Sequence, residues 1–134
     1  MPDYTAVYGP SKVVTLTASG AISGGDVLEI AGSGTVRKCQ TLRSMNYIGC
    51  AADDTVTGGR VTVFSRGYIH ESIADGAITA GDQLVTSATA GRQVVTLPPL
   101  GGAPGQADVN AARAIIGVAL TTVADNTKVR WMEF

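Results

Sequence analysis

The chain has 134 residues, with 10 lysines and arginines against 11 aspartates and glutamates, and so a formal net charge of −1. This balance, with no strongly basic half, excludes the charge pattern of a typical nucleic-acid-binding protein. The length suits one domain that buries a core of its own. Seventeen glycines, abundant Val, Thr and Ala, and little Lys or Glu favour short strands joined by turns over helices.

Residues 1–10 are expected to form an extended N-terminal arm. Tyr4, Val7 and Tyr8 are its larger apolar side chains, and Gly9-Pro10 separates them from the first strand. Because proline has no N–H to donate to a sheet, the arm should be independent of the core and able to bind a partner. The chain begins without the basic and apolar segments of a signal peptide, and no apolar stretch has membrane-spanning length. We therefore expect no membrane partner.

Residues 11–134 are expected to form a single all-β domain, a small barrel or sandwich of short strands. Apolar and β-branched runs are separated by turn residues about every eight to twelve positions, which is typical of such folds. Residues 107–113 could form a helical turn, although their apolar spacing is poor for a helix. The strands are expected at residues 13–17, 27–31, 35–39, 47–52, 60–65, 67–72, 83–87, 92–97, 114–121 and 128–133.

One sequence motif occurs twice. Gly-Ala-Ile-Ser-Gly-Gly-Asp-Val-Leu-Glu-Ile at residues 20–30 is answered by Gly-Ala-Ile-Thr-Ala-Gly-Asp-Gln-Leu-Val-Thr at 76–86, an offset of 56 residues. Further pairs follow at an offset of 68, namely 48–51 with 116–119 and 61–64 with 129–132. We therefore predict two copies of one β-unit, about 11–66 and 67–134, in which Leu28 matches Leu84 and Val63 matches Trp131.

Each copy of the motif is expected to turn the chain and start a strand. Gly25 and Gly81 should adopt the positive φ that other residues resist. Asp26 and Asp82 should then hydrogen-bond the nearby backbone as Asx-turns. After the first turn, Leu28 and Ile30 are expected on one strand face, and Val27 and Glu29 on the other.

The change of offset from 56 to 68 requires an insertion of 12 residues in the second copy. The Pro/Gly-rich run at residues 98–105 is the expected place for it, because prolines and glycines interrupt strands and favour loops.

Few residues in the chain suggest catalytic chemistry. His70 is the only histidine, and strand alternation directs the neighbouring Glu71 to the opposite face. Asp53 and Asp54 are expected in a solvated loop rather than as a carboxylate pair. We therefore expect a protein that is not an enzyme and uses no metal or cofactor.

The remaining polar candidates also have structural explanations. Cys39 and Cys50 could pair across a hairpin, but two free, buried thiols are the expected state in a protein made in the cytoplasm. Arg37, Lys38 and Arg43 are expected to form a solvated basic rim.

The order of these motifs resembles that of the small capsid decoration, or cement, proteins of tailed bacteriophages. The resemblance covers most of residues 10–133 and follows Gly-Ala-Ile-x-x-Gly-Asp-Val-Leu, Ile-Gly-Cys-Ala-Ala-Asp-Asp, Gly-Gly-Arg-Val-Thr-Val, Gly-Asp-Gln-Leu-Val and Ile-Ile-Gly-Val-Ala-Leu. It implies a β-barrel-like virion protein, made in the host cytoplasm, that forms a homotrimer on the outer surface of an expanded capsid. It also implies that the protein stabilises the head by clamping neighbouring major capsid subunits.

A second class remains open, namely a non-enzymatic surface module that recognises glycans or a host surface. Sugar sites commonly stack rings on exposed aromatic side chains, so these residues discriminate between the two classes. The chain has one Trp, two Phe and four Tyr, with no clustered aromatic platform in the sequence.

Overall fold

The computed structural model describes residues 13–65, 67–98, 102–103 and 105–134. The predicted arm, with Tyr4, Val7 and Tyr8, lies outside these residues. The predicted all-β class is confirmed: the described residues form ten strands and one short helix. The elements are β1 (Val13–Ala18), β2 (Val27–Gly32), β3 (Thr35–Lys38), β4 (Tyr47–Ala51), β5 (Arg60–Phe64), β6 (Ile69–Ile73), β7 (Gln83–Thr86), β8 (Val94–Thr96), α1 (Gln106–Arg113), β9 (Gly117–Ala119) and β10 (Lys128–Glu133).

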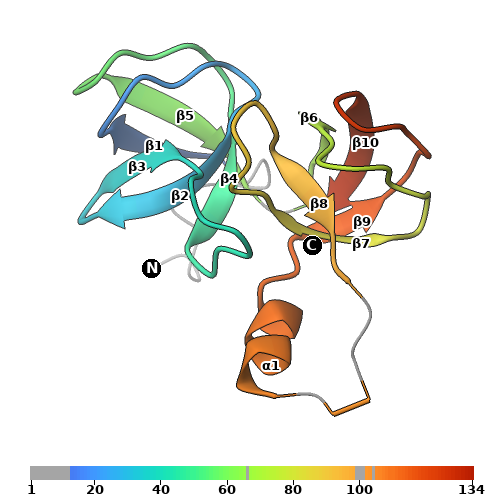
Figure 1. Ribbon diagram of the computed structural model, residues 1–134. Helices are drawn as coiled ribbons and strands as arrows, with labels where there is room; N and C mark the ends of the chain where they lie inside the picture. The colour runs from blue at the N-terminus through green and yellow to red at the C-terminus, as the bar shows by residue number, and fades with distance from the viewer. Residues whose placement is uncertain (1–12, 66, 99–101, 104) are drawn as a thin grey trace, which may run out of the picture.

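The strands form two five-stranded units that lie side by side (Figure 1). The first unit is a closed barrel of order β1-β3-β2-β4-β5, and the second is a sheet of order β6-β10-β9-β7-β8. A parallel pairing of β1 with β3 closes the barrel. In the second unit, a single parallel bridge between Ala74 and Val94 lies at the equivalent place. The two units therefore share one pattern of strand pairing.

The registers of the two units match residue by residue. In each unit, a leucine on the second strand lies opposite a glycine on the fourth, and the residue two positions after that glycine lies opposite the fifth strand. The matching pairs are Leu28–Gly49 with Leu84–Gly117, and Ala51–Val63 with Ala119–Trp131. Leu28, Leu84, Val63 and Trp131 all have 0% exposed surface, so both units fill their interiors from the same positions.

The extra residues of the second unit fall in two places, not only in the 98–105 run where the sequence analysis put them. Val36 and Val94 occupy equivalent positions, because Val36 O accepts a hydrogen bond from Ser19 N and Val94 O accepts one from Asp75 N. The offset between the two units is therefore 58 residues at β8. Two residues therefore lengthen the β7–β8 turn, where Gly91 has a φ of 74°. The other ten lie between β8 and β9, in the stretch that includes α1.

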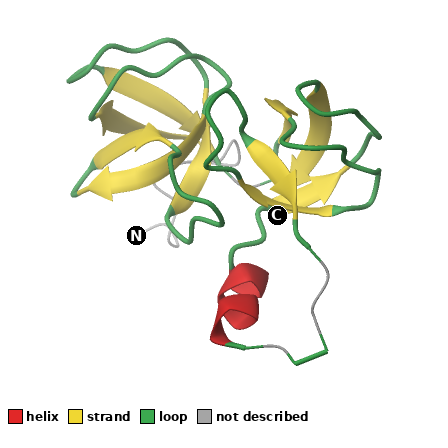
Figure 2. Ribbon diagram, viewed as in Figure 1, coloured by secondary structure: helices red, strands yellow, loops and turns green. Residues whose placement is uncertain are grey.

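The helix α1 corrects the expectation of at most a helical turn at residues 107–113. The Asp108 carboxylate accepts a hydrogen bond of 2.7 Å from Gly105 N, which satisfies a backbone donor at the start of the helix. Arg113 lies in the last turn, where a cation complements the helix dipole. The helix stands away from the sheets (Figure 2), and Val109 is 52% exposed. It therefore needs no apolar face, which explains the poor apolar spacing of its sequence. Its caps, rather than core packing, favour the helix.

The two units share part of their hydrophobic core. One cluster fills the first barrel and includes Leu28, while a larger cluster joins the second sheet to Val27 and Cys50 of the first unit. Adjacent residues Val27 and Leu28 are therefore both buried, on opposite faces of β2. The contacts of Glu29 follow the expected alternation, since its carboxylate accepts from Cys39, which packs against the same cluster as Val27. Glu29 is 1% exposed and Ile30 is 38% exposed.

Alanine at the matching glycines of β4 and β9 should destabilise the protein by more than about 3 kcal/mol. A Cβ at Gly49 would lie 2.1 Å from Phe64 O, and one at Gly117 would lie 2.2 Å from Met132 O. The control is Gly25→Ala, since Gly25 has a φ of 88° but open space around its missing Cβ. That change should cost only the left-handed backbone penalty, roughly 1–2 kcal/mol. Equal losses for both classes in urea unfolding would contradict the close-approach argument.

Candidate functional site

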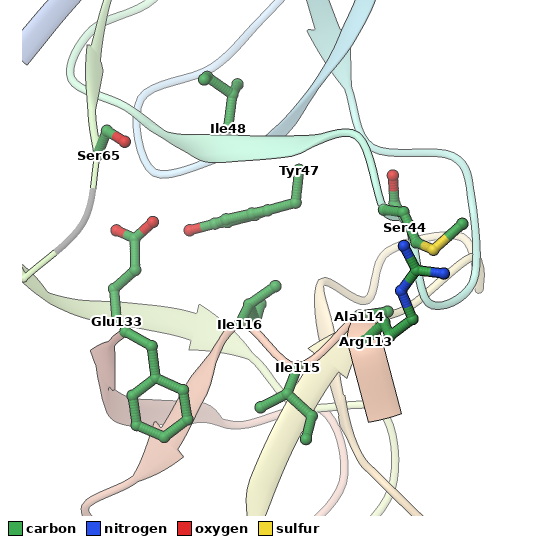
Figure 3. Close-up of a pocket in the computed structure, with 11 residues that line it drawn as sticks. Ser44, Tyr47, Ile48, Ser65, Arg113, Ala114, Ile115, Ile116 and Glu133 are labelled. Carbon is green, nitrogen blue, oxygen red and sulfur yellow. The ribbon is translucent and has the colours of Figure 1, made fainter. Parts of the chain in front are cut away.

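A cavity of about 180 Å³ lies where the two units meet. We call this region the seam. The first unit contributes residues 39–51 to it, and the second unit contributes Thr86, residues 113–116 and β10. Figure 3 shows side chains from both units around the cavity. Its lining consists of Ser44, Met45, Tyr47, Ile48, Ser65, Arg113, Ala114, Ile115, Ile116, Glu133 and Phe134.

The buried carboxylate of Glu29 organises one side of the seam, the β3–β4 loop at residues 39–46. Burial opposes ionisation of Glu29, but hydrogen bonds from the loop and from Arg37 outweigh this effect and lower its pKa. The charge is therefore paired and hydrogen-bonded, as a buried carboxylate requires. The donors are Ser44 Oγ at 2.8 Å, Arg37 Nε at 3.0 Å, Gln40 N at 3.2 Å and Thr41 Oγ1 at 3.3 Å.

The second unit holds the same loop through Thr86. The Thr86 hydroxyl donates to Thr41 O at 2.8 Å and accepts from Ser44 N at 2.7 Å. Arg43 N donates to Thr86 O at 3.0 Å. The β3–β4 loop is thus fixed from both units, and its conformation depends on their contact.

The tip of this loop exposes two apolar side chains, with a partly buried arginine between them. Leu42 is 50% exposed and Met45 is 60% exposed. Between them, Arg43 has a φ of 55°, and its buried Nε has no hydrogen-bond partner among the described residues. Arg37 and Lys38 of the expected basic rim are solvated, with 43% and 52% of their side chains exposed. Each also lies near a carboxylate, because Arg37 pairs with Glu29 and Lys38 Nζ lies 3.9 Å from Asp26.

A buried polar cluster lies deeper in the seam. His70 Nε2 is 2.9 Å from Glu133 Oε2, and both side chains are less than 10% exposed. The Tyr47 hydroxyl and the Glu133 carboxylate face each other across the cavity (Figure 3). Burial, followed by the charges of Cys50 and Glu133, raises the pKa of Tyr47. Burial, with a further contribution from Glu133, raises the pKa of Cys50 to about 12, so its thiol is unreactive near neutral pH.

His70 and Glu71 point to opposite faces of β6, as the sequence predicts. His70 is buried, whereas Glu71 is exposed and pairs with Arg130 Nη2 at 2.8 Å. Ser72 Oγ accepts from Trp131 Nε1 at 2.9 Å. Among the described residues, no serine or cysteine is hydrogen-bonded to His70 in the manner of an activated nucleophile.

The two predicted turns have matching geometry at the start of β2 and β7. Gly25 has a φ of 88° and Gly81 a φ of 95°. Asp26 Oδ2 accepts from Ser23 N at 2.9 Å, and Asp82 Oδ2 accepts from Thr79 N at 2.9 Å. The first turn also contacts the second unit, because Gln93 Nε2 donates to Gly25 O at 3.2 Å.

The other predicted polar residues lie apart from the seam cavity or serve structure. Cys39 and Cys50 are free, as expected, but only Cys50 is fully buried. Asp53 and Asp54 are exposed in a loop, where Asp54 Oδ1 accepts from Gly24 N. Within the described ranges, no three His, Cys, Asp or Glu residues gather as metal ligands. No helix in the same ranges is long and apolar enough to span a membrane.

No sequence motif singles out Glu29, Ser44 and Thr86 as seam residues. Their contacts join positions 15 and 42 residues apart, so no local pattern reveals them. The one available signal was Glu29 itself, a charged residue that directly follows two apolar residues, Val27 and Leu28, in a strand.

The architecture is thus a tandem of two five-stranded β-units with a common pairing pattern. The same fold occurs in a solved structure, that of the head fiber gp8.5 N base in bacteriophage phi29. The two share a TM-score of 0.61 and 16% sequence identity, over 91% of this chain and 92% of that one. No family model matches the chain. No curated protein matches it.

The shared core predicts that both units unfold together. Val27 and Cys50 belong to the larger cluster, so loss of the second unit would expose apolar surface of the first. Scanning calorimetry should show one transition whose calorimetric and van't Hoff enthalpies agree. Two resolved transitions would contradict this and make each unit an independent domain.

Glu29→Gln should lower the stability at neutral pH by roughly 1–3 kcal/mol, because it removes a charged acceptor from several donors. The folded-state pKa of Glu29 lies below 4.5, so its contribution is complete above that pH and is lost as the pH falls through the folded value. The variant should therefore lose less stability than the wild type on acidification. Glu71→Gln is the matched control, since its pair with Arg130 is exposed and should contribute little. The prediction would be contradicted if the free energy of unfolding in urea fell with pH by the same amount for E29Q and for the wild type.

Proposed function

We propose that this chain is a structural protein of a bacteriophage virion that binds the outer surface of the expanded capsid and stabilises it. The observation that carries the proposal is the fold match over nearly the full length of both chains, since the matched protein is a head fiber of a phage. The order of sequence motifs supports the same role, because it resembles that of capsid decoration proteins.

The seam supports a binding role rather than a catalytic one. Its β3–β4 loop is held by Glu29 and Thr86 before any partner binds, so little conformational entropy is lost on docking. The His70–Glu133 pair is buried between β6 and β10, with 8% and 5% of the side chains exposed, so it is not placed to meet a substrate from solvent.

We further propose that the protein acts as a homotrimer that clamps neighbouring major capsid subunits. Each contact can be weak, because a copy that touches several subunits gains affinity from the geometry of the shell. The arm, with Tyr4, Val7 and Tyr8, would tie copies to a neighbour by adding a strand to an exposed sheet edge.

The alternative role, glycan recognition, gains no comparable support. Trp131 is fully buried, Tyr47 lies in the seam, and Phe64 packs against Tyr68 with tilted rings whose centroids are 4.9 Å apart. Among the described aromatic residues, Phe134 is the one whose exposed fraction, 51%, reaches that of a surface side chain.

The direct test is to mix the purified protein with undecorated, expanded capsids of the phage that encodes it and to measure occupancy by electron microscopy. Ordered density on the outer surface, together with capsids that resist heat better than bare ones, is the expected result. Capsids that stay bare at saturating protein would refute the proposed function.

Deletion of residues 2–9 should leave the domain folded but sharply reduce capsid occupancy. An arm of this length can reach at most about 30 Å, far enough to lie on a neighbour. Its loss would remove a strand of main-chain hydrogen bonds at every copy. Thermal unfolding checks the fold and quantitative microscopy checks the occupancy. Unchanged occupancy would move the docking face to the β-units, whereas an unfolded truncation would make the arm part of the core.

A further inference from the structure

The tip of the β3–β4 loop combines three features that are unfavourable in the isolated protein. Leu42 and Met45 expose 50% and 60% of their surface. Arg43 between them adopts a φ of 55°, in the left-handed region. Its Nε is buried, and no group in the described part of the chain forms a hydrogen bond with it. Each feature costs free energy in a free monomer.

The backbone of Arg43 is constrained by its surroundings rather than by its own preference. Asn126 is the other described non-glycine residue with positive φ, at 60°, and asparagine tolerates that conformation. Arginine does not, so glycine or asparagine would fit better at position 43. The hydrogen bonds of Arg43 N to Thr86 and of Ser44 to Glu29 hold the loop in this shape nevertheless. Strain retained in a fixed loop points to a role for the side chain.

No carboxylate of the described residues satisfies the Arg43 guanidinium. Glu29, the carboxylate to which the loop is bonded, is already paired with Arg37 and Ser44. Arg113 on the cavity rim, which Met45 also lines, has no ion pair among the described residues either. The loop tip therefore presents unneutralised positive charge flanked by apolar side chains.

We propose that Leu42, Arg43 and Met45 form the docking surface for an acidic segment of the major capsid subunit, in which a carboxylate pairs with the Arg43 guanidinium. This inference rests on the proposed function and specifies the partner chemistry of its contact. A planar guanidinium takes a carboxylate in a two-bond geometry. The flanking Leu42 and Met45 exclude water around that pair, as the surroundings of interface hot spots do.

The first experiment measures binding of Arg43 variants to undecorated, expanded capsids as a function of protein and salt concentration. Arg43→Gln should weaken capsid binding by about tenfold or more and reduce its salt dependence. Arg43→Gly should weaken binding as well, yet leave the melting temperature equal to that of the wild type or higher, because it relieves the backbone strain. Arg43→Lys should retain intermediate affinity, since it keeps the charge without the planar fork.

Two matched controls separate this role from general effects of charge and backbone. Asn126→Gly relaxes the other positive-φ residue and should leave capsid binding unchanged. Arg60→Gln removes a different exposed arginine, on β5, and should also bind as the wild type. If either control weakens binding as much as Arg43→Gln, the assignment to the loop tip is wrong.

A second experiment identifies the partner group. The R43K variant places a primary amine at the loop tip, and a carbodiimide joins an amine to a carboxylate within ion-pair distance. Mass spectrometry of the treated decorated capsids should find one new cross-link, absent from the wild type, between the loop peptide and an Asp or Glu of the capsid subunit.

The possible outcomes distinguish a failure of the proposed function from a failure of the docking surface alone. If the wild type leaves capsids bare, the proposed function fails and the partner assignment fails with it. If the wild type binds but R43Q binds equally well, only the docking surface is overturned. A cross-link to a second copy of this chain, in place of the capsid, would also overturn the assignment. A melting temperature of R43G well below that of the wild type would show that the side chain serves folding instead.

Discussion

One carboxylate, that of Glu29, fixes the loop through which the first β-unit meets Thr86 of the second. With 1% of its surface exposed, this charge is retained only because surrounding donors replace water. Most of the donors come from a single eight-residue connection, so satisfying the charge also fixes the connection. Thr86 from the other unit adds three hydrogen bonds to the same segment. Burial of a charge thus gives the seam a defined geometry that apolar packing alone would leave less specific.

This geometry explains why the loop, and not the barrel, carries the proposed contact with a capsid. Barrel strands satisfy their backbone groups within the unit, whereas the loop presents side chains that the fold leaves unpaired. The equivalent connection of the second unit contains the ten extra residues and carries α1. The two equivalent connections therefore differ in structure. The first is a short, fixed loop, and the second contains a capped helix that stands away from the sheets (Figure 1).

The strands could be predicted from the sequence, while the seam could not. Each strand has local signals, such as the glycine and aspartate that precede Leu28 and Leu84, and these signals recur because the pairing pattern recurs. The helix α1 was underestimated because its stability comes from Asp108 at its first turn and not from an apolar face. The contacts of Glu29 and Thr86 join residues that are distant in sequence, so only the folded chain brings them together. Arg43 looked like an ordinary surface arginine, since backbone strain leaves no trace in composition.

The core that the two units share has a consequence for how such a chain evolves. A tandem repeat can usually shed a copy by the same recombination that created it. Here the outward face of β2 and β4, with Val27 and Cys50, has become interior, and the loop beside it relies on a threonine of the other copy. A descendant that lost the second unit would inherit an exposed apolar face and a released loop. The duplication is consequently entrenched, and further diversification is confined to the connections and the outer surfaces.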